Sequence, residues 1–169
     1  MGFLVSGFFA MGEHPSKSDL DIIEEMCCTI GHIVVLWGYV EYNLYFCLST
    51  IYIKYGCKTT NQKIPKFLKR QIEYLRKCFE SDLLLPFKDQ GLLLINRIAS
   101  LSKKRDEIIH STYFGIEKAS INFKKFGFNT PKRLYINDVE HTMATLLDTQ
   151  KKIDILANDL VDFYYRLEG

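Results

Sequence analysis

The chain has 169 residues, 47% hydrophobic and 25% charged, which is typical of one compact globular domain. Its 22 Lys and Arg against 20 Asp and Glu leave a net charge of +2, which argues against a histone-like protein or one that acts through an acidic tail. The five cysteines include no C-x-x-C pair, so we expect reduced thiols, mostly in the core, of a cytoplasmic protein rather than a disulfide framework or a zinc site.

Residues 1–18 are expected to form a mobile N-terminal arm ahead of a single domain at residues 19–169. The apolar start, Met1 to Met11, lacks the basic beginning and the small-residue cleavage pattern of a signal peptide. We interpret it as an arm or a cloning remnant, with a removed secretory signal as the alternative.

The first predicted helix runs from Asp19 to about Tyr55, before Gly56. Glu41 falls inside its apolar stripe, so we expect this carboxylate at a polar cleft or at the margin of the stripe. Glu41 and Lys54 interrupt the apolar run, which falls short of the about 18 unbroken residues that a membrane crossing needs, so no membrane partner is expected. The predicted stripe consists of Leu20, Ile23, Cys27, Ile30, Val34, Trp37, Leu44, Leu48 and Ile51.

A second helix is predicted from about Pro65 to Phe79, with Phe67, Leu68, Ile72 and Leu75 on its apolar side. The stretch from Lys54 to Lys77 carries eight Lys or Arg and one Glu, a local charge of +7. Such a density suits a phosphate backbone, although a solvated helix face explains each single Lys equally well. The candidate RNA-binding residues are Lys63, Lys66, Lys69, Arg70 and Lys104.

A third helix is predicted from about Lys88 to Thr112, with Leu94, Ile98, Leu101 and Ile108 on one face. Residues 113–136 lose the helical period, which favours a small β-hairpin or an ordered loop. The last helix is expected to begin at Asn137, where Glu140 would complete a capping box. Its predicted buried face consists of Val139, Met143, Leu146, Ile153, Leu156, Leu160, Phe163 and Leu167. Together these elements predict an all-α fold, an antiparallel bundle of four to five helices.

The end of the third helix carries the residues that suggest chemistry. Asp106 and His110 are four residues apart and share a helix face, and Tyr113 follows about one turn later. Arg105 occupies the apolar stripe, where a guanidinium needs an anionic partner. Glu41 is the expected partner at rest and a phosphate the expected partner in action. An ordinary surface ion network would explain the same residues without any function.

This segment resembles the signature of the HEPN superfamily. The string RDEIIHS, from Arg105 to Ser111, matches its R-x4-6-H motif, with a polar residue directly after the Arg. The string LWGYVEYNL, from Leu36 to Leu44, is similar to the first helix of that superfamily, with an aromatic residue followed by a Glu. The order of a long helix, a basic helix, a motif helix and a final helix is likewise similar.

The resemblance implies a helical domain that dimerises so that two motifs face one cleft. It also implies a metal-independent endoribonuclease of a toxin–antitoxin or phage-defence system, with Arg105, His110 and Asp106 catalytic and Glu41 and Tyr113 supporting. Some members are toxins whose antitoxin modifies a Tyr in an H-x-Y element. Here Tyr113 has H-x-x-Y spacing, which puts that modification in doubt.

The residue types suit RNA cleavage on chemical grounds as well. RNA supplies its own 2′-OH nucleophile, so the protein needs a group to move protons and a cation for the phosphate. Histidine and arginine meet these needs without a metal or cofactor. This chemistry predicts RNA as a partner, and the resemblance implies a second copy of the chain and an antitoxin or regulatory protein as further partners.

The alternative function is a non-catalytic helical module that binds RNA or a partner protein through the basic second helix. The chain has no G-x-G-x-x-G, phosphate-loop, H-E-x-x-H or G-x-S-x-G motif that would favour other enzyme classes. His32 and His141 have no matching partners in the sequence, and we expect both to be structural.

Overall fold

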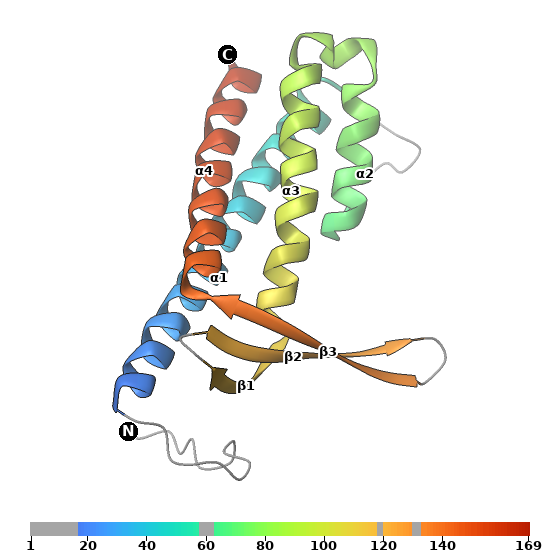
Figure 1. Cartoon of the computed structure of the whole chain (residues 1–169). Coiled ribbons are helices and arrows are strands. Elements are labelled where there is room, and N and C mark those ends of the chain that lie inside the picture. Colours follow the sequence, from blue (N-terminus) through green and yellow to red (C-terminus); the bar gives the residue numbers. More distant parts are fainter. Residues whose placement is uncertain (1–16, 58–62, 118–119, 130–132) are drawn as a thin grey trace.

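The structure is a computed structural model that describes residues 17–57, 63–117, 120–129 and 133–169. Within these ranges, four α-helices form a bundle, and a three-stranded sheet lies across one end of it (Figure 1). The helices are α1 (Lys17–Ile53), α2 (Leu68–Phe79), α3 (Lys88–Ile109) and α4 (Met143–Glu168), with a short 3-10 helix, η1 (Asp82–Phe87), before α3. The predicted helical bundle is therefore confirmed as the body of the molecule.

The N-terminal boundary differs slightly from the prediction. Because α1 begins at Lys17, the last two residues assigned to an arm belong to the helix. The rest of that predicted arm, residues 1–16, lies outside the described residues. None of the helices in the described ranges combines the length and the apolar character needed to cross a membrane.

The segment between α3 and α4 forms an antiparallel sheet in the order β1-β2-β3. Its strands are β1 (Ser111–Glu117), β2 (Ser120–Asn129) and β3 (Arg133–Thr142). The prediction of a hairpin before the last helix is thus correct in kind but one strand short.

The prediction that the last helix begins at Asn137 is wrong. Asn137 pairs with Lys125, and Glu140 pairs with Asn122, in the ladder between β2 and β3. The capping pattern is a local signal, whereas pairing along a whole strand satisfies many backbone groups at once. The helix begins six residues later, where the Thr142 hydroxyl accepts the backbone N–H of Thr145 at 3.1 Å and the Thr145 hydroxyl accepts that of Thr142 at 3.0 Å.

The helices do not all alternate in direction. α3 runs antiparallel to α4, as the contacts of Arg97 with Asp159 and of Gln90 with Arg166 show. However, α1 and α4 run parallel, since early residues of both helices meet at Thr29 and Met143, and late ones at Thr50 and Glu168. This corrects the prediction of a fully antiparallel bundle. α3 already ends at the end of the bundle where α1 starts, and the sheet lies across that end, so α4 starts there and runs in the same direction as α1 (Figure 1).

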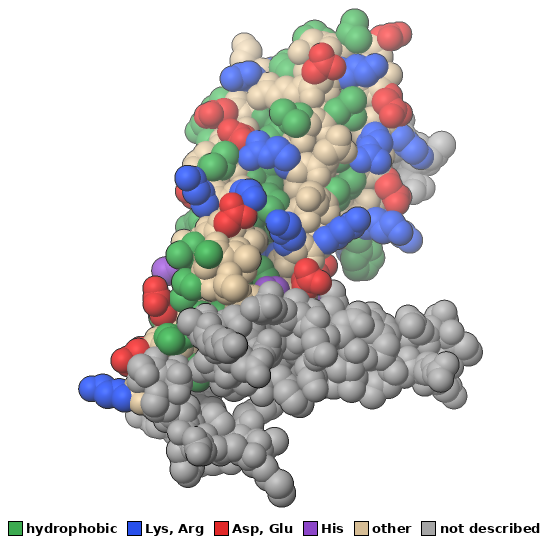
Figure 2. Space-filling model, in the orientation of Figure 1, with side chains coloured by type: hydrophobic (Ala, Val, Ile, Leu, Met, Phe, Trp, Pro, Cys, Tyr) green, Lys and Arg blue, Asp and Glu red, His purple; other side chains and the backbone are tan. Residues whose placement is uncertain are grey.

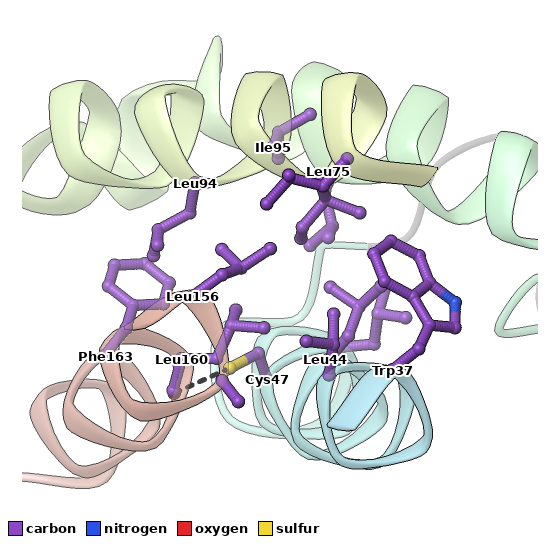
Figure 3. Packing of buried hydrophobic residues seen from close by; sticks show 14 of the residues in the cluster. Trp37, Leu44, Cys47, Leu75, Leu94, Ile95, Leu156, Leu160 and Phe163 are labelled. Atoms are coloured by element: carbon purple, nitrogen blue, oxygen red, sulfur yellow. Dashed lines mark hydrogen bonds between the residues drawn. The ribbon is translucent and has the colours of Figure 1, made fainter. Parts of the chain in front are cut away.

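The core lies between α1, α3 and α4, with α2 covering one side (Figure 3). Every predicted core position of α3 is buried, as are all those of α4 from Leu146 onward. In α1 the predicted stripe is correct from Trp37 onward; before it, Ile23 and Ile30 are partly buried against the core, whereas Leu20, Cys27 and Val34 are exposed. The residues buried there instead are Met26, Thr29 and Ile33. Between Met26 and Val40, α1 has no Asp, Glu, Lys or Arg on either face, so periodicity alone could not choose between the faces.

The start of α2 differs in part from the sequence prediction, whereas most of the cysteines are buried as predicted. The structure starts α2 at Leu68, and Phe67 is 69% exposed rather than on the buried side. At the other end of α2, Phe79 packs flat on Gly91 of α3, where an added Cβ would lie 2.5 Å from the ring. All five cysteines are free thiols, and the buried ones are Cys47, Cys57 and Cys78.

Candidate active site

Arg105 is held on the indole ring of Trp37. Trp37 is 2% exposed, and its ring nitrogen is directed away from the other core side chains drawn in Figure 3. The Arg105 guanidinium carbon lies 5.1 Å from the centre of that ring, a cation–π distance. The Arg105 side chain is 21% exposed. A rigid aromatic platform thus fixes the guanidinium near the surface.

Two carboxylates neutralise this guanidinium. Arg105 Nη2 donates to Glu41 Oε1 at 3.3 Å, and Nη1 donates to Asp106 Oδ1 at 2.7 Å. The same Glu41 oxygen accepts the indole N–H of Trp37 at 2.8 Å. The prediction that Glu41 is the resting partner of Arg105 is therefore confirmed. Because both carboxylates are about half exposed, these ion pairs are weak and open to exchange.

One buried donor of Arg105, its Nε, has no hydrogen-bond acceptor among the described residues. A buried guanidinium N–H without an acceptor is unfavourable, so the group retains capacity for a further anion. Reorientation of the side chain toward a phosphate would satisfy it.

His110 lies at the C-terminal end of α3, with φ −94° and ψ 8°, and its side chain is exposed. Its backbone N–H donates to the carbonyl oxygen of Asp106 at 3.0 Å. The Asp106 carboxylate contacts Arg105, and among the described residues no hydrogen bond joins it to the imidazole of His110, although the two residues share a helix face. Tyr113 follows in β1, where it pairs with Phe123 in a register that shifts just beyond it. Its side chain lies outside what the structure describes.

The predicted basic residues on and before α2 are exposed. Lys63, Lys66, Lys69 and Arg70 all reach solvent, and Figure 2 shows Lys and Arg side chains over the α2 side of the molecule. Arg76 donates to Asn96 of the antiparallel α3 at 3.1 Å, which aligns the two helices. Because both helices rise by the same amount per residue, that alignment brings the start of α2 level with the end of α3 that carries Arg105.

Lys104 lies apart from this basic group. It lines a pocket of about 190 Å³ between α3 and the start of α4, on the other flank of α3. The pocket is lined by Lys104, Glu107, Ile108, His141, Thr145, Asp148 and Thr149. The predicted set of RNA-binding residues is thus divided between two sides of α3.

His141 is the residue of this region whose setting the sequence did not indicate. It is 7% exposed, and burial lowers its pKa below the ordinary value of 6.5, while the nearby Glu107 acts in the opposite direction. Glu107 belongs to α3 and His141 lies near the end of β3, so the two are far apart in the sequence and no local spacing could reveal that they are close. In the parts of the chain that are described, no group of three or more His, Cys, Asp or Glu is arranged to hold a metal ion.

Comparison with known proteins found no matching family model, no matching curated protein and no matching solved structure.

Proposed function

We propose that the chain is a metal-independent endoribonuclease that cleaves single-stranded RNA through attack of the 2′-OH. The placement of Arg105 carries this proposal. A guanidinium stacked on a buried indole, with a spare buried donor and two exchangeable carboxylates, is ready to bind a phosphate. An exposed His110 follows five residues later on the same helix end.

The proposed steps use only side chains of the chain and its partner copy. Arg105 binds the scissile phosphate and stabilises the negative charge that develops on its oxygens. An imidazole accepts the 2′-OH proton as that oxygen attacks phosphorus, and a second imidazole donates a proton to the departing 5′-oxygen. The products are a 2′,3′-cyclic phosphate and a free 5′-hydroxyl. Asp106 shares Arg105 with the phosphate, and Glu41 is displaced from it.

A homodimer is part of the proposal because each chain offers one His110. Two copies related by a two-fold axis would supply both the acid and the base to one cleft. The exposed basic residues Lys63, Lys66, Lys69 and Arg70 would flank that cleft and neutralise neighbouring phosphates. A toxin–antitoxin or phage-defence setting in the cytoplasm, with an antitoxin or regulatory partner, is proposed from the HEPN resemblance alone.

The test incubates the purified protein with single-stranded RNA in EDTA and identifies the fragment ends. We expect 2′,3′-cyclic phosphate ends, loss of cleavage in His110→Ala and in Arg105→Met, and full cleavage in His32→Ala. His32 is the matched control, because it is an exposed histidine on α1 away from Arg105. Cleavage that survives His110→Ala would refute the assignment.

A second candidate is the non-catalytic module that binds RNA through α2. The observation in its favour is that the lysines and arginines of α2 are exposed while Tyr74, Leu75, Cys78 and Phe79 are buried, so its outer face is free for phosphates. Intact RNA combined with binding that weakens steeply with salt would favour this module over the nuclease.

A further inference from the structure

The face of α1 opposite the core is apolar, and no described residue covers it. From Met26 to Ile53 this helix carries one Asp, Glu, Lys or Arg, which is Glu41. Contiguous exposed apolar surface of this kind marks interaction sites in soluble proteins. Its large side chains, 47–61% exposed, are Val34, Val35, Tyr39, Tyr42 and Tyr45.

Part of this face has the spacing of a helix-pairing seam. Six residues recur at alternating intervals of three and four, as the core positions of a coiled coil do. The first half of the seam is occupied mainly by small residues and the second half by tyrosines. The seam consists of Cys28, Gly31, Val35, Gly38, Tyr42 and Tyr45.

Packing among the described residues requires neither of the two glycines of the seam. Gly31 and Gly38 lie in the middle of a long helix, where glycine is a poor helix former. A Cβ added at either position would meet nothing within 4 Å, so packing inside the chain does not require glycine there. Close approach of another helix would require it.

We infer that two copies of this chain pair through α1 in antiparallel orientation, about a two-fold axis level with the peptide between Leu36 and Trp37. This register places a large side chain against a small one at every level of the seam. A parallel pairing would instead set tyrosine against tyrosine and leave glycine against glycine. The facing pairs are Tyr45 with Cys28, Tyr42 with Gly31, and Val35 with Gly38, each joining the two copies.

The available surface suits a dimer of modest affinity. Tyr39, Tyr42 and Tyr45, at 53–61% exposure, present roughly 350 Å² if a fully exposed ring side chain has about 200 Å². With the valines and small residues the contact approaches the lower end of specific interfaces, about 600 Å² from each copy. Near absence of charge on the seam leaves no repulsion between two identical surfaces. We therefore expect dissociation in the micromolar range.

The pairing has a consequence for the candidate active site. Glu41 lies at one edge of the seam, about 7 Å along the helix from the inferred axis. A two-fold axis perpendicular to the helices keeps corresponding edges on the same side, so both Glu41–Arg105 groups open toward one face of the dimer. This consequence deepens the proposed function and rests on it, whereas the pairing itself does not depend on RNA cleavage.

The first test measures association of the full chain by sedimentation across a concentration series. We expect a monomer–dimer equilibrium that Gly31→Leu shifts at least tenfold toward monomer, with helicity and thermal stability retained or raised, because glycine is a poor helix former and that site is open in the monomer. Glu25→Leu adds the same side chain at an exposed position of α1 away from the seam and should leave the dimer intact. A wild-type monomer at all concentrations, or equal effects of the two variants, would overturn the inference.

The second test fixes the register by mild oxidation. In a Cys27→Ser background, Tyr45→Cys should form a disulfide with Cys28 of the other copy, while Leu93→Cys, similarly exposed but on α3, should not. Crosslinking between two Cys28 residues in Cys27→Ser alone would show parallel pairing and refute the register. If a variant lacking residues 1–16 dimerises while the full chain does not, that segment occupies the face instead, which also refutes the inference.

Discussion

Replacing Glu41 with Gln should tighten the binding of single-stranded RNA. Glu41 Oε1 accepts hydrogen bonds from the Trp37 indole at 2.8 Å and from Arg105 at 3.3 Å. Glutamine keeps an acceptor oxygen for the indole and so preserves the local geometry. It removes the negative charge with which an RNA phosphate has to compete for the guanidinium.

The size of the effect follows from the distance and the exposure. A phosphate bound to Arg105 would lie about 5 Å from the Glu41 carboxylate, where two unit charges repel by about 0.8 kcal/mol in bulk water and about 3 kcal/mol at an effective dielectric constant of 20. The Glu41 side chain is 50% exposed, so the value near the aqueous limit applies. We therefore expect Glu41→Gln to strengthen RNA binding by about 1 kcal/mol, which is an increase in affinity of about fivefold. The lost ion pair should cost less than about 1 kcal/mol of stability.

Fluorescence anisotropy with a labelled single-stranded RNA measures this change, in a His110→Ala background that leaves the RNA intact and at one fixed salt concentration. Glu80→Gln is the matched control, because it makes the same change in net charge at the far end of α2, beyond the screening length from Arg105. If Glu41→Gln weakens binding, or changes it no more than Glu80→Gln does, Arg105 is not the phosphate site.

Three further predictions concern stability. Gly91→Ala should lower the free energy of unfolding by about 1–3 kcal/mol in chemical denaturation, because its Cβ would lie 2.5 Å from the buried Phe79 ring; an unchanged value would show that the ring moves freely. Burial lowers the pKa of His141, so the unfolded chain binds more protons and stability should fall as pH drops through the ordinary value of 6.5. His141→Gln should flatten that part of the Tm–pH curve, and an identical slope would contradict the assignment. Thr142→Ala should lower the free energy of unfolding by about 1 kcal/mol, because it removes the side-chain cap of α4. An unchanged free energy of unfolding in chemical denaturation would show that the cap is dispensable.

Local patterns in the sequence were sufficient for much of the helical core. The predicted core positions are correct in α3, for example Leu94 and Ile98, and in α4, for example Leu156 and Leu160. Each of these helices has a single apolar face, so the spacing of its apolar residues identifies the buried side. The pairing of Glu41 with Arg105 was also predictable, since a guanidinium inside an apolar stripe requires an anion and Glu41 interrupts the facing stripe.

Tertiary structure decided the rest where two local solutions were equally good or where the partner lay far along the chain. From Met26 to Val40, α1 carries no Asp, Glu, Lys or Arg on either face, so only packing on α4 shows that Ile33 is buried and Val34 exposed. Asn137 and Glu140 have the pattern of a helix start, yet pairing with β2 takes them into a strand because it satisfies the backbone of the whole segment. His141 lies near Glu107 only because the sheet folds back on the end of α3. A contact between residues so far apart in the sequence cannot be predicted from local residue spacing.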